Sequence, residues 1–428
     1  MKKITILIPK IKPPEETDIV TNQLKNIFSK LEKNYQLNLV WLVFQPEKFE
    51  EYEFDESLVL DYHKYNDGYD VIKDVQPDLI ITEVRLGING IIFSLVGKFN
   101  KIPVITITPT GESEFFSQNF SLKSIFHLFL SDNVLGNTFR KRKPKKFAML
   151  KFSLHRYNFL LKTLKKIDYS FLEIFRFFIL YPRIQIFSKT YPALHNITSG
   201  NVNICFNEHW KLRLIDSNFP KNSITLSGDP AFDKIYDQIY NKKIQSSNSN
   251  KIHVIICPTP MHEHGWMTKN NEHKLILSLI KYLQSLENIL VSLKIHPSSS
   301  SYSEYENLLK SNRIEIPLFQ KENTIDLLKK SNLMITYGSS NVILDAILLH
   351  LPVILIKNNQ IPLLKRLESS DIITECNNIY DLKNSIGFAI NHSLPNEIYE
   401  KYIFKQIGIF DGKNSERISD IICKLLHD

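Results

Sequence analysis

The sequence contains few cysteines and no long apolar run, and both absences narrow the class of protein. Cys205, Cys257, Cys376 and Cys423 are far apart, without paired metal-ligand spacing, so we expect free thiols in a reducing compartment. No uncharged apolar segment approaches the ~18 residues of a membrane-spanning helix, and the first apolar segment, Ile4–Ile8, is too short for a signal-peptide core. These features predict a cytoplasmic protein.

The charge balance indicates an anionic partner. The chain of 428 residues has 53 Lys and Arg against 45 Asp and Glu, a net charge of +8. Such an excess suits nucleic acid, a phosphorylated metabolite or an anionic membrane surface. Hydrophobic residues make up 43% of the chain and no low-complexity segment dominates, so we expect ordinary globular domains.

The order of apolar segments predicts an α/β fold with two Rossmann-like domains. Strands expected at 4–8, 37–44, 78–83 and 104–108 alternate with helical patterns, which is typical of a parallel sheet. The polar segment 241–250 is the best linker, and a second strand-helix series starts at Ile252. We therefore expect an N-terminal domain over residues 1–240 and a C-terminal domain over residues 251–428, ending in an amphipathic helix that packs back toward the first domain.

The segment 139–183 interrupts this alternation, because aromatic and basic residues are interleaved along it. One interpretation is a helical insertion whose aromatic side packs on the domain while its lysines stay solvated. Another is an interfacial patch, since basic amphipathic helices bind anionic lipid headgroups. No recognised nucleic-acid motif accompanies the segment, so we expect no nucleic-acid partner.

The stretch from Ile289 to Leu355 carries the strongest indication of a ligand site. A buried strand ending near Thr336 is followed by Gly338, Ser339 and Ser340 and then by a helical pattern. Helix N-termini and serine hydroxyls offer hydrogen-bond donors to anions, and glycine lets a phosphate approach the backbone. His296 follows the preceding strand, so both features lie at strand carboxyl ends, where open α/β sheets bind ligands. A structural serine cap is the competing interpretation.

Several short motifs occur in one order along the second half of the chain. They are Gly228-x-Pro230-x-x-Asp233, Pro258-Thr259, Lys294-x-His296-Pro297, Tyr337-x-Ser339-Ser340 with Asp345, and Asp411-Gly412-Lys413-x-Ser415-x-Arg417. With these motifs the chain resembles GT-B-type transferases, and within them the CDP-glycerol glycerophosphotransferase and capsular polysaccharide transferase group. The resemblance extends from about Ile224 to the C-terminus.

The resemblance implies two Rossmann-like domains facing a cleft, and an enzyme that moves a glycosyl or polyol-phosphate group. The donor would be CDP- or UDP-linked, and the acceptor a surface glycan or a lipid-linked molecule at the inner membrane face. It implies no bound metal and no cofactor besides the donor. His296 would assist the leaving diphosphate as a catalytic residue. The expected nucleotide-binding residues are Thr259, Gly338, Ser339, Ser340, Asp345, Lys413, Ser415 and Arg417.

Other polar residues have alternative roles that the sequence leaves open. His262, Glu263 and His264 lack the second half of a zinc site, so we expect donor or acceptor contacts, with His264 as a catalytic candidate. Asp345 either reaches the ribose hydroxyls or bonds neighbouring backbone. For the acceptor base, Glu112 at the end of a strand-loop is preferred over two further candidates, Glu83 and His63.

Two alternatives to a transferase share the same architecture. UDP-GlcNAc 2-epimerases have a similar His-Pro strand end, although they typically show Ser-Gly-Gly followed by paired glutamates where this chain has Gly338-Ser-Ser and Asp345. A GT-B subunit that binds nucleotide or glycan without catalysis is the non-enzymatic alternative.

Overall fold

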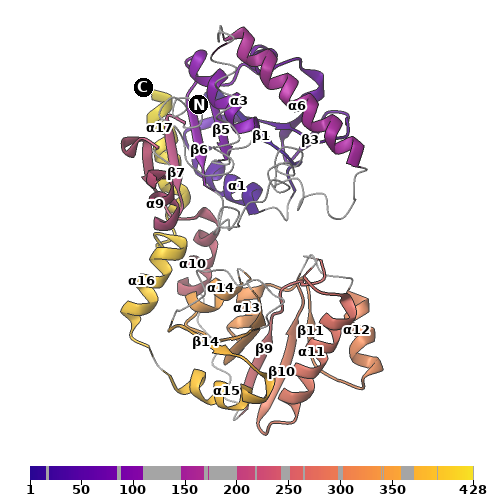
Figure 1. The fold of residues 1–428 in the computed structure, drawn as a ribbon. Coiled ribbons are helices and arrows are strands. Elements are labelled where there is room, and N and C mark those ends of the chain that lie inside the picture. Colours follow the sequence, from indigo (N-terminus) through magenta and orange to yellow (C-terminus); the bar gives the residue numbers. More distant parts are fainter. Residues whose placement is uncertain are drawn as a thin grey trace. The chain divides into compact units, whose positions relative to one another are not determined.

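The chain forms two compact units (Figure 1). The computed structural model describes residues 1–15, 19–83, 88–108, 146–167, 172, 200–216, 219–241, 251–263, 266–296, 302–338, 340, 342–357, 371–392 and 394–427. Unit 1 comprises Met1–Asp233 and Ile407–Asp428, and unit 2 comprises Lys234–Gln406. This division differs from the predicted one, because helix α10 (Asp233–Asn241) lies almost wholly in unit 2 and residues 407–428 belong to unit 1.

Unit 1 is built on a sheet whose described strands follow the order β3-β4-β2-β1-β5-β6-β7-β8. Neighbouring strands are parallel except β3, which runs antiparallel to β4. Because helices cover both faces, β1 is buried on both sides: Ile4 and Ile6 face one core and Leu7 the other. The strands are β1 (Lys2–Lys10), β2 (Tyr35–Val43), β3 (Tyr52–Phe54), β4 (Ser57–Asp61), β5 (Leu79–Glu83), β6 (Val104–Ile107), β7 (Val202–Cys205) and β8 (Ile224–Leu226).

Two groups of helices cover the faces of this sheet. Helices α1 (Ile19–Leu31) and α17 (Asn414–His427) pack together on one face, where Ile418 and Ile422 are fully buried. The other face is covered by α2 (Gly68–Val75), α3 (Ile88–Phe99) and α6 (Lys146–Lys166). Helix α9 (Glu208–Asp216) and the 3-10 turns η1 (Tyr62–Lys64), η4 (Lys221–Ser223) and η5 (Pro230–Phe232) complete the described part of unit 1. Helix α6 makes up most of the described part of the predicted insertion 139–183.

Unit 2 has a parallel sheet whose described strands follow the order β11-β10-β9-β12-β13-β14. One face packs against α11, α12 and α15, and the other against α13, α14 and α16. The strands are β9 (Ile252–Ile256), β10 (Ile289–Lys294), β11 (Leu318–Phe319), β12 (Leu333–Tyr337), β13 (Val353–Ile356) and β14 (Ile373–Cys376). The helices are α11 (Lys269–Gln284), α12 (Tyr302–Ser311), α13 (Thr324–Leu328), α14 (Val342–Leu348), α15 (Leu382–Asn391) and α16 (Asn396–Ile407), with η6 at Ile379–Asp381.

The predicted α/β class with two parallel-sheet, Rossmann-like domains is confirmed. Within the described residues, no helix combines the length and the apolar character needed to cross a membrane.

Candidate functional site

The strand order of unit 2 changes direction beside β9, and several candidate residues gather there. From β9 the chain continues to β10 on one side, and it later places β12 on the other. Parallel sheets bind ligands outside the strand carboxyl ends at such a switch. The carboxyl ends of β9, β10 and β12 lead into Thr259, His296 and Gly338 respectively. The fold thus brings three predicted site residues to one edge of one sheet.

Thr259 is a buried polar residue at this edge. It is 3% exposed, and its backbone N–H donates to the carbonyl of Tyr337 at 3.3 Å, which ties the end of β9 to the end of β12. Its Oγ1 is buried and has no hydrogen-bond partner among the described residues. Buried hydroxyls are nearly always hydrogen-bonded. Thr259 is therefore equipped to bond a polar ligand atom or a water.

The turn after β12 has the backbone form that the sequence predicts. Gly338 has φ +69°, a left-handed conformation that side-chain-bearing residues rarely adopt. The carbonyl of Ser340 accepts the backbone N–H of Ile343 at 3.1 Å, which starts α14. Ser339 lies outside the described residues, so its role as an anion ligand stays a prediction. Gly338 and Ser340 lie between the sheet edge and α14, as expected.

Asp345 lies in the first turn of α14 and carries a perturbed carboxyl group. It is partly exposed, and the described residues provide no hydrogen bond to its carboxylate. Desolvation by the surrounding apolar core raises the pKa of Asp345 from 3.8 to about 7. The carboxyl group can therefore exchange a proton near neutral pH, and as a carboxylate it can accept hydrogen bonds from hydroxyl groups.

The end of β10 combines a buried lysine with a more accessible histidine. Lys294 is 6% exposed, its Nζ donates to the carbonyl of Gln320 at 2.8 Å, and burial lowers its pKa. His296 follows two residues later and is partly exposed. His296 therefore lies at the carboxyl edge of the sheet, whereas Lys294 bonds the backbone that follows β11.

The loop after β9 is hydrogen-bonded to a buried residue of α11 that the sequence analysis missed. Glu272 on α11 is 2% exposed and accepts the backbone N–H of His262 at 2.9 Å and the hydroxyl of Tyr305 at 3.3 Å. Burial raises the pKa of Glu272.

His264 lies outside the described residues. No group of three His, Cys, Asp or Glu side chains within the described part of the chain is arranged to hold a metal ion.

The C-terminal motif lies in unit 1 and is bonded to the Gly228–Asp233 motif. Asp233 accepts the backbone N–H groups of Asn414 at 3.0 Å and Ser415 at 2.7 Å, and the Ser415 hydroxyl at 2.6 Å. Arg417 forms a bidentate ion pair with Asp411, with N–O distances of 2.8 and 3.0 Å. The two motifs that support the resemblance thus bind each other.

These bonds occupy two of the predicted nucleotide ligands. Ser415 is 1% exposed and directed to Asp233, and the Nε of Arg417 donates to the carbonyl of Ser227 at 2.9 Å. Lys413 is exposed, and its backbone N–H donates to Asp411 at 3.0 Å. The three residues belong to unit 1, whereas Thr259, His296 and Gly338–Asp345 belong to unit 2. Neither unit brings the two sets of predicted ligands together.

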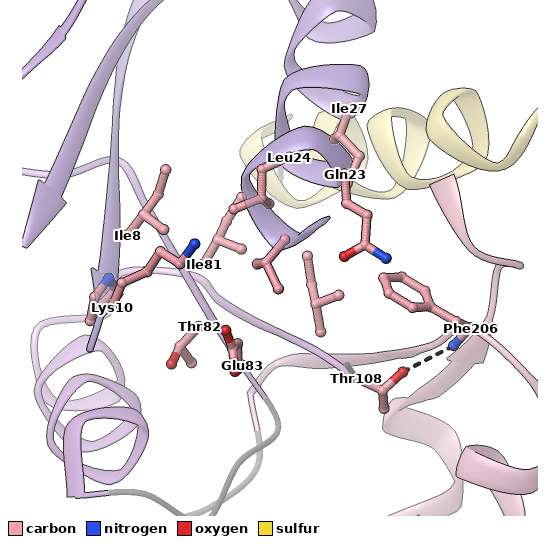
Figure 2. A pocket seen from close by; sticks show the side chains of 13 residues that line it. Ile8, Lys10, Gln23, Leu24, Ile27, Ile81, Thr82, Glu83, Thr108 and Phe206 are labelled. Atoms are coloured by element: carbon pink, nitrogen blue, oxygen red, sulfur yellow. Dashed lines mark hydrogen bonds between the residues drawn. The ribbon is translucent and has the colours of Figure 1, made fainter. Parts of the chain in front are cut away.

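Unit 1 has a pocket at its own switch point, between β1 and β5 (Figure 2). Its walls are mainly apolar side chains of β1, β5, β6 and α1. Three longer polar side chains also line it: the Nζ of Lys10 donates to Thr21 at 3.1 Å, the Nε2 of Gln23 donates to Asp229 at 2.6 Å, and Glu83 ends β5. Unit 1 therefore offers a mainly apolar recess where parallel sheets bind ligands.

An aspartate-histidine pair follows β4, at the same edge of the unit 1 sheet. The Nδ1 of His63 lies 2.7 Å from Oδ1 of Asp61, which also accepts the backbone N–H of His63 at 3.0 Å. This bond orients the imidazole and favours the tautomer with a proton on Nδ1, leaving Nε2 as an acceptor. His63 was one of the sequence candidates; Asp61 was missed, although a strand-end aspartate two residues before a histidine could have indicated it. Glu112 lies outside the described residues.

Comparison with known proteins adds the name of the fold. No protein-family model and no curated protein sequence matches the chain. Among solved structures, the glycotransferase of kitacinnamycin has a TM-score of 0.53 at 10% identity, covering all of both chains. The UDP complex of S. aureus MnaA has a TM-score of 0.51 at 11% identity, covering 100% of this chain and 97% of that one.

A third structure extends this likeness. UDP-GlcNAc 2-epimerase from Neisseria meningitidis, bound to UDP-GlcNAc, has a TM-score of 0.51 at 13% identity and covers 98% of this chain and 100% of its own. Because the sequence identities to these three structures are only 10–13%, the likeness shows the fold alone. The two parallel-sheet units of this chain together have the GT-B fold of glycosyltransferases and UDP-GlcNAc 2-epimerases.

Proposed function

We propose that this protein transfers a glycosyl or polyol-phosphate group from a nucleotide-activated donor to a glycan or lipid-linked acceptor. The observation that carries the proposal is the polar cluster at the switch point of unit 2. Three residues follow the carboxyl ends of β9 and β12 there. The buried hydroxyl of Thr259 has no partner among the described residues, Gly338 has a left-handed backbone conformation, and the carboxyl group of Asp345 is desolvated. A nucleoside diphosphate has the phosphate and hydroxyl groups that such a cluster would bind.

Each residue of this cluster has a proposed role. His296 and Thr259 contact the diphosphate, which approaches the backbone closely at Gly338, and Ser339 and Ser340 add hydroxyl donors. Asp345 accepts hydrogen bonds from the ribose. Stabilising the negative charge that develops on the leaving diphosphate is the main catalytic effect. Ser415 and Arg417 already bond within unit 1, so Lys413 is the candidate ligand that remains in that motif.

The acceptor side of the reaction is assigned to unit 1. Glu83 at the pocket and the Asp61–His63 pair are described candidates for the base, and Glu112 stays a candidate from sequence. A base must come within hydrogen-bond reach of the acceptor hydroxyl. His264 stays a catalytic candidate of the loop after β9.

Nucleotide titration of the full chain tests the proposal. UDP is the first probe, because two neighbours of this fold were solved with UDP or UDP-GlcNAc; CDP, GDP and CMP follow by calorimetry. We expect one nucleoside diphosphate to bind, and His296→Ala to weaken it by about one to two orders of magnitude through loss of a charge-assisted contact. His350→Gln, at an exposed position after the C-terminal end of α14, is the matched control and should bind normally. Absence of binding by all four nucleotides would refute the proposal.

A structure of similar fold is named as a UDP-GlcNAc 2-epimerase, so the epimerase alternative has its own test. Epimerisation needs UDP-GlcNAc alone, whereas transfer needs a second substrate. Incubating the protein with UDP-GlcNAc and following the C2 configuration by proton NMR separates the two. We expect no inversion at C2; appearance of the C2 epimer would replace the transferase assignment.

A further inference from the structure

Helix α6 presents a straight basic stripe that the proposed reaction does not use. The helix has 21 residues and no acidic one among them. Exposed side chains recur at steps of four and three residues, which places them on one side of the helix. These exposed residues are Lys151, His155, Asn158, Lys162 and Lys165. The stripe is about 21 Å long at 1.5 Å per residue.

The opposite side of α6 fixes the helix to unit 1. Phe152, Phe159 and Leu164 are buried in the core under α6. At its C-terminal end, Lys166 pairs with Asp67 at 2.7 Å and Asp70 at 2.9 Å. The stripe is therefore displayed by a docked helix, and its lysines keep their positions relative to one another.

The charges of the stripe are available to a partner. Lys166 uses the two carboxylates next to the helix, whereas Lys151, Lys162 and Lys165 form no ion pair within the described ranges. Beside them, the apolar side chain of Leu154 is 60% exposed. Lysines flanking an exposed leucine on one helix side form the pattern of a helix lying in a lipid headgroup region.

We propose that this stripe docks unit 1 onto an anionic lipid surface. The three lysines attract acidic headgroups, and Leu154 enters the boundary between headgroups and acyl chains. A bilayer fits better than a nucleic acid, because a flat surface can contact the whole stripe at once and gives Leu154 an apolar environment. The proposal concerns α6 alone, so it stands or falls independently of which reaction the protein catalyses.

Vesicle flotation of the full chain tests the proposal. The probes are vesicles of phosphatidylcholine alone and of phosphatidylcholine with 30% phosphatidylglycerol, at low and high salt. We expect binding to the anionic vesicles only, weakening as salt rises. The triple variant K151Q/K162Q/K165Q should bind about 100-fold more weakly, since each lysine contributes roughly fivefold. Leu154→Asn should reduce the binding that persists at high salt.

A matched control separates the stripe from overall charge. The variant K33Q/K274Q/K383Q removes three exposed lysines from other helices and turns, and it should bind as the unchanged chain does. Circular dichroism should show the same helix content in all variants, because every substituted side chain is exposed. Equal binding to neutral and anionic vesicles, equal losses in both triple variants, or retention on single-stranded RNA in place of vesicles would each overturn the proposal.

Discussion

The carboxylate of Asp233 holds the first turn of α17 through Ser415, a residue 182 positions further along the chain. It accepts both the backbone N–H of Ser415, at 2.7 Å, and its hydroxyl, at 2.6 Å. The first N–H groups of a helix have no intrahelical partner and carry the positive end of the helix dipole. Asp233 thus serves as a remote cap that keeps α17 on the sheet of unit 1.

Asp233→Ala should therefore destabilise unit 1. Removing a buried carboxylate leaves three donors unsatisfied, and we expect the free energy of unfolding to fall by about 3 kcal/mol. Urea unfolding followed by circular dichroism measures this loss. Asp420→Asn, at an exposed position of the same helix, should change stability by less than about 0.5 kcal/mol. Equal stability of the Asp233 variant and the control would contradict the capping role.

Thr259→Val and Thr336→Val form a matched pair. The Thr259 hydroxyl has no partner in the described part of unit 2, so its removal should leave stability unchanged or slightly raised. The Thr336 hydroxyl donates to the carbonyl of Cys257 at 2.7 Å, so its loss should cost about 1 kcal/mol.

Nucleotide affinity should rank the two variants in the opposite order to stability. Calorimetry with the nucleotide that binds the unchanged protein measures this affinity. Thr259→Val should weaken binding about tenfold, and Thr336→Val should leave it nearly unchanged. Full affinity in Thr259→Val would remove that hydroxyl from the proposed site.

Asp345 should make stability depend on pH. Its folded pKa of about 7 exceeds the unfolded value of 3.8, so the folded state binds more protons between these values. Stability from this group is present in full below about pH 4 and declines as pH rises to about 7. Asp345→Asn should remove the decline, so the variant gains about 1–2 kcal/mol relative to the unchanged protein between pH 5 and pH 8, after allowance for partial exposure.

Thermal unfolding at several pH values measures this difference. Asp371→Asn, at an exposed position, should parallel the unchanged protein throughout. If the difference between the Asp345 variant and the unchanged protein were constant with pH, desolvation of this carboxyl would be refuted.

Gly408→Ala should be strongly destabilising. Gly408 has φ +82°, and an added Cβ would lie 2.0 Å from the carbonyl oxygen of Phe206. Backbone strain and this clash together predict a loss of about 3 kcal/mol or more. Gly387→Ala on α15 is the control, because its Cβ would meet no atom within 4 Å; there a helical alanine should add about 0.5–1 kcal/mol. Chemical unfolding measures the stability of both variants. A Gly408→Ala variant as stable as the unchanged protein would contradict the close approach of Gly408 to the carbonyl of Phe206.

The local pattern of the sequence predicted both parallel sheets and the strand ends where the candidate residues lie. Strands such as Leu333–Tyr337 are short apolar runs, and the turn at Gly338 needs a residue that tolerates positive φ, so both could be recognised from neighbouring residues. Because parallel strands end at one edge, Thr259 and His296 could also be expected near that turn.

Relationships between distant residues could not be predicted in this way. Ser415 and Arg417 have the polar groups of nucleotide ligands, and nothing in their motif shows that Asp233 and Asp411 bond to them. The desolvation of Asp345 depends on the apolar residues folded around it, which adjacent sequence does not specify. The expected packing of the C-terminal helix toward the first domain is confirmed by the burial of Ile418, whereas sequence order alone had counted the last 22 residues with the second domain.

The return of α17 to unit 1 sets the order in which the protein can fold during synthesis. Unit 2 is one continuous segment, Lys234–Gln406, and all of it is synthesised before α17. Residues 1–233 are synthesised before unit 2, yet the sheet face that packs against Ile418 and Ile422 stays uncovered until α17 has also been made. The first unit to be synthesised is therefore the last to complete its core, and during that interval its exposed apolar face is a substrate for chaperones.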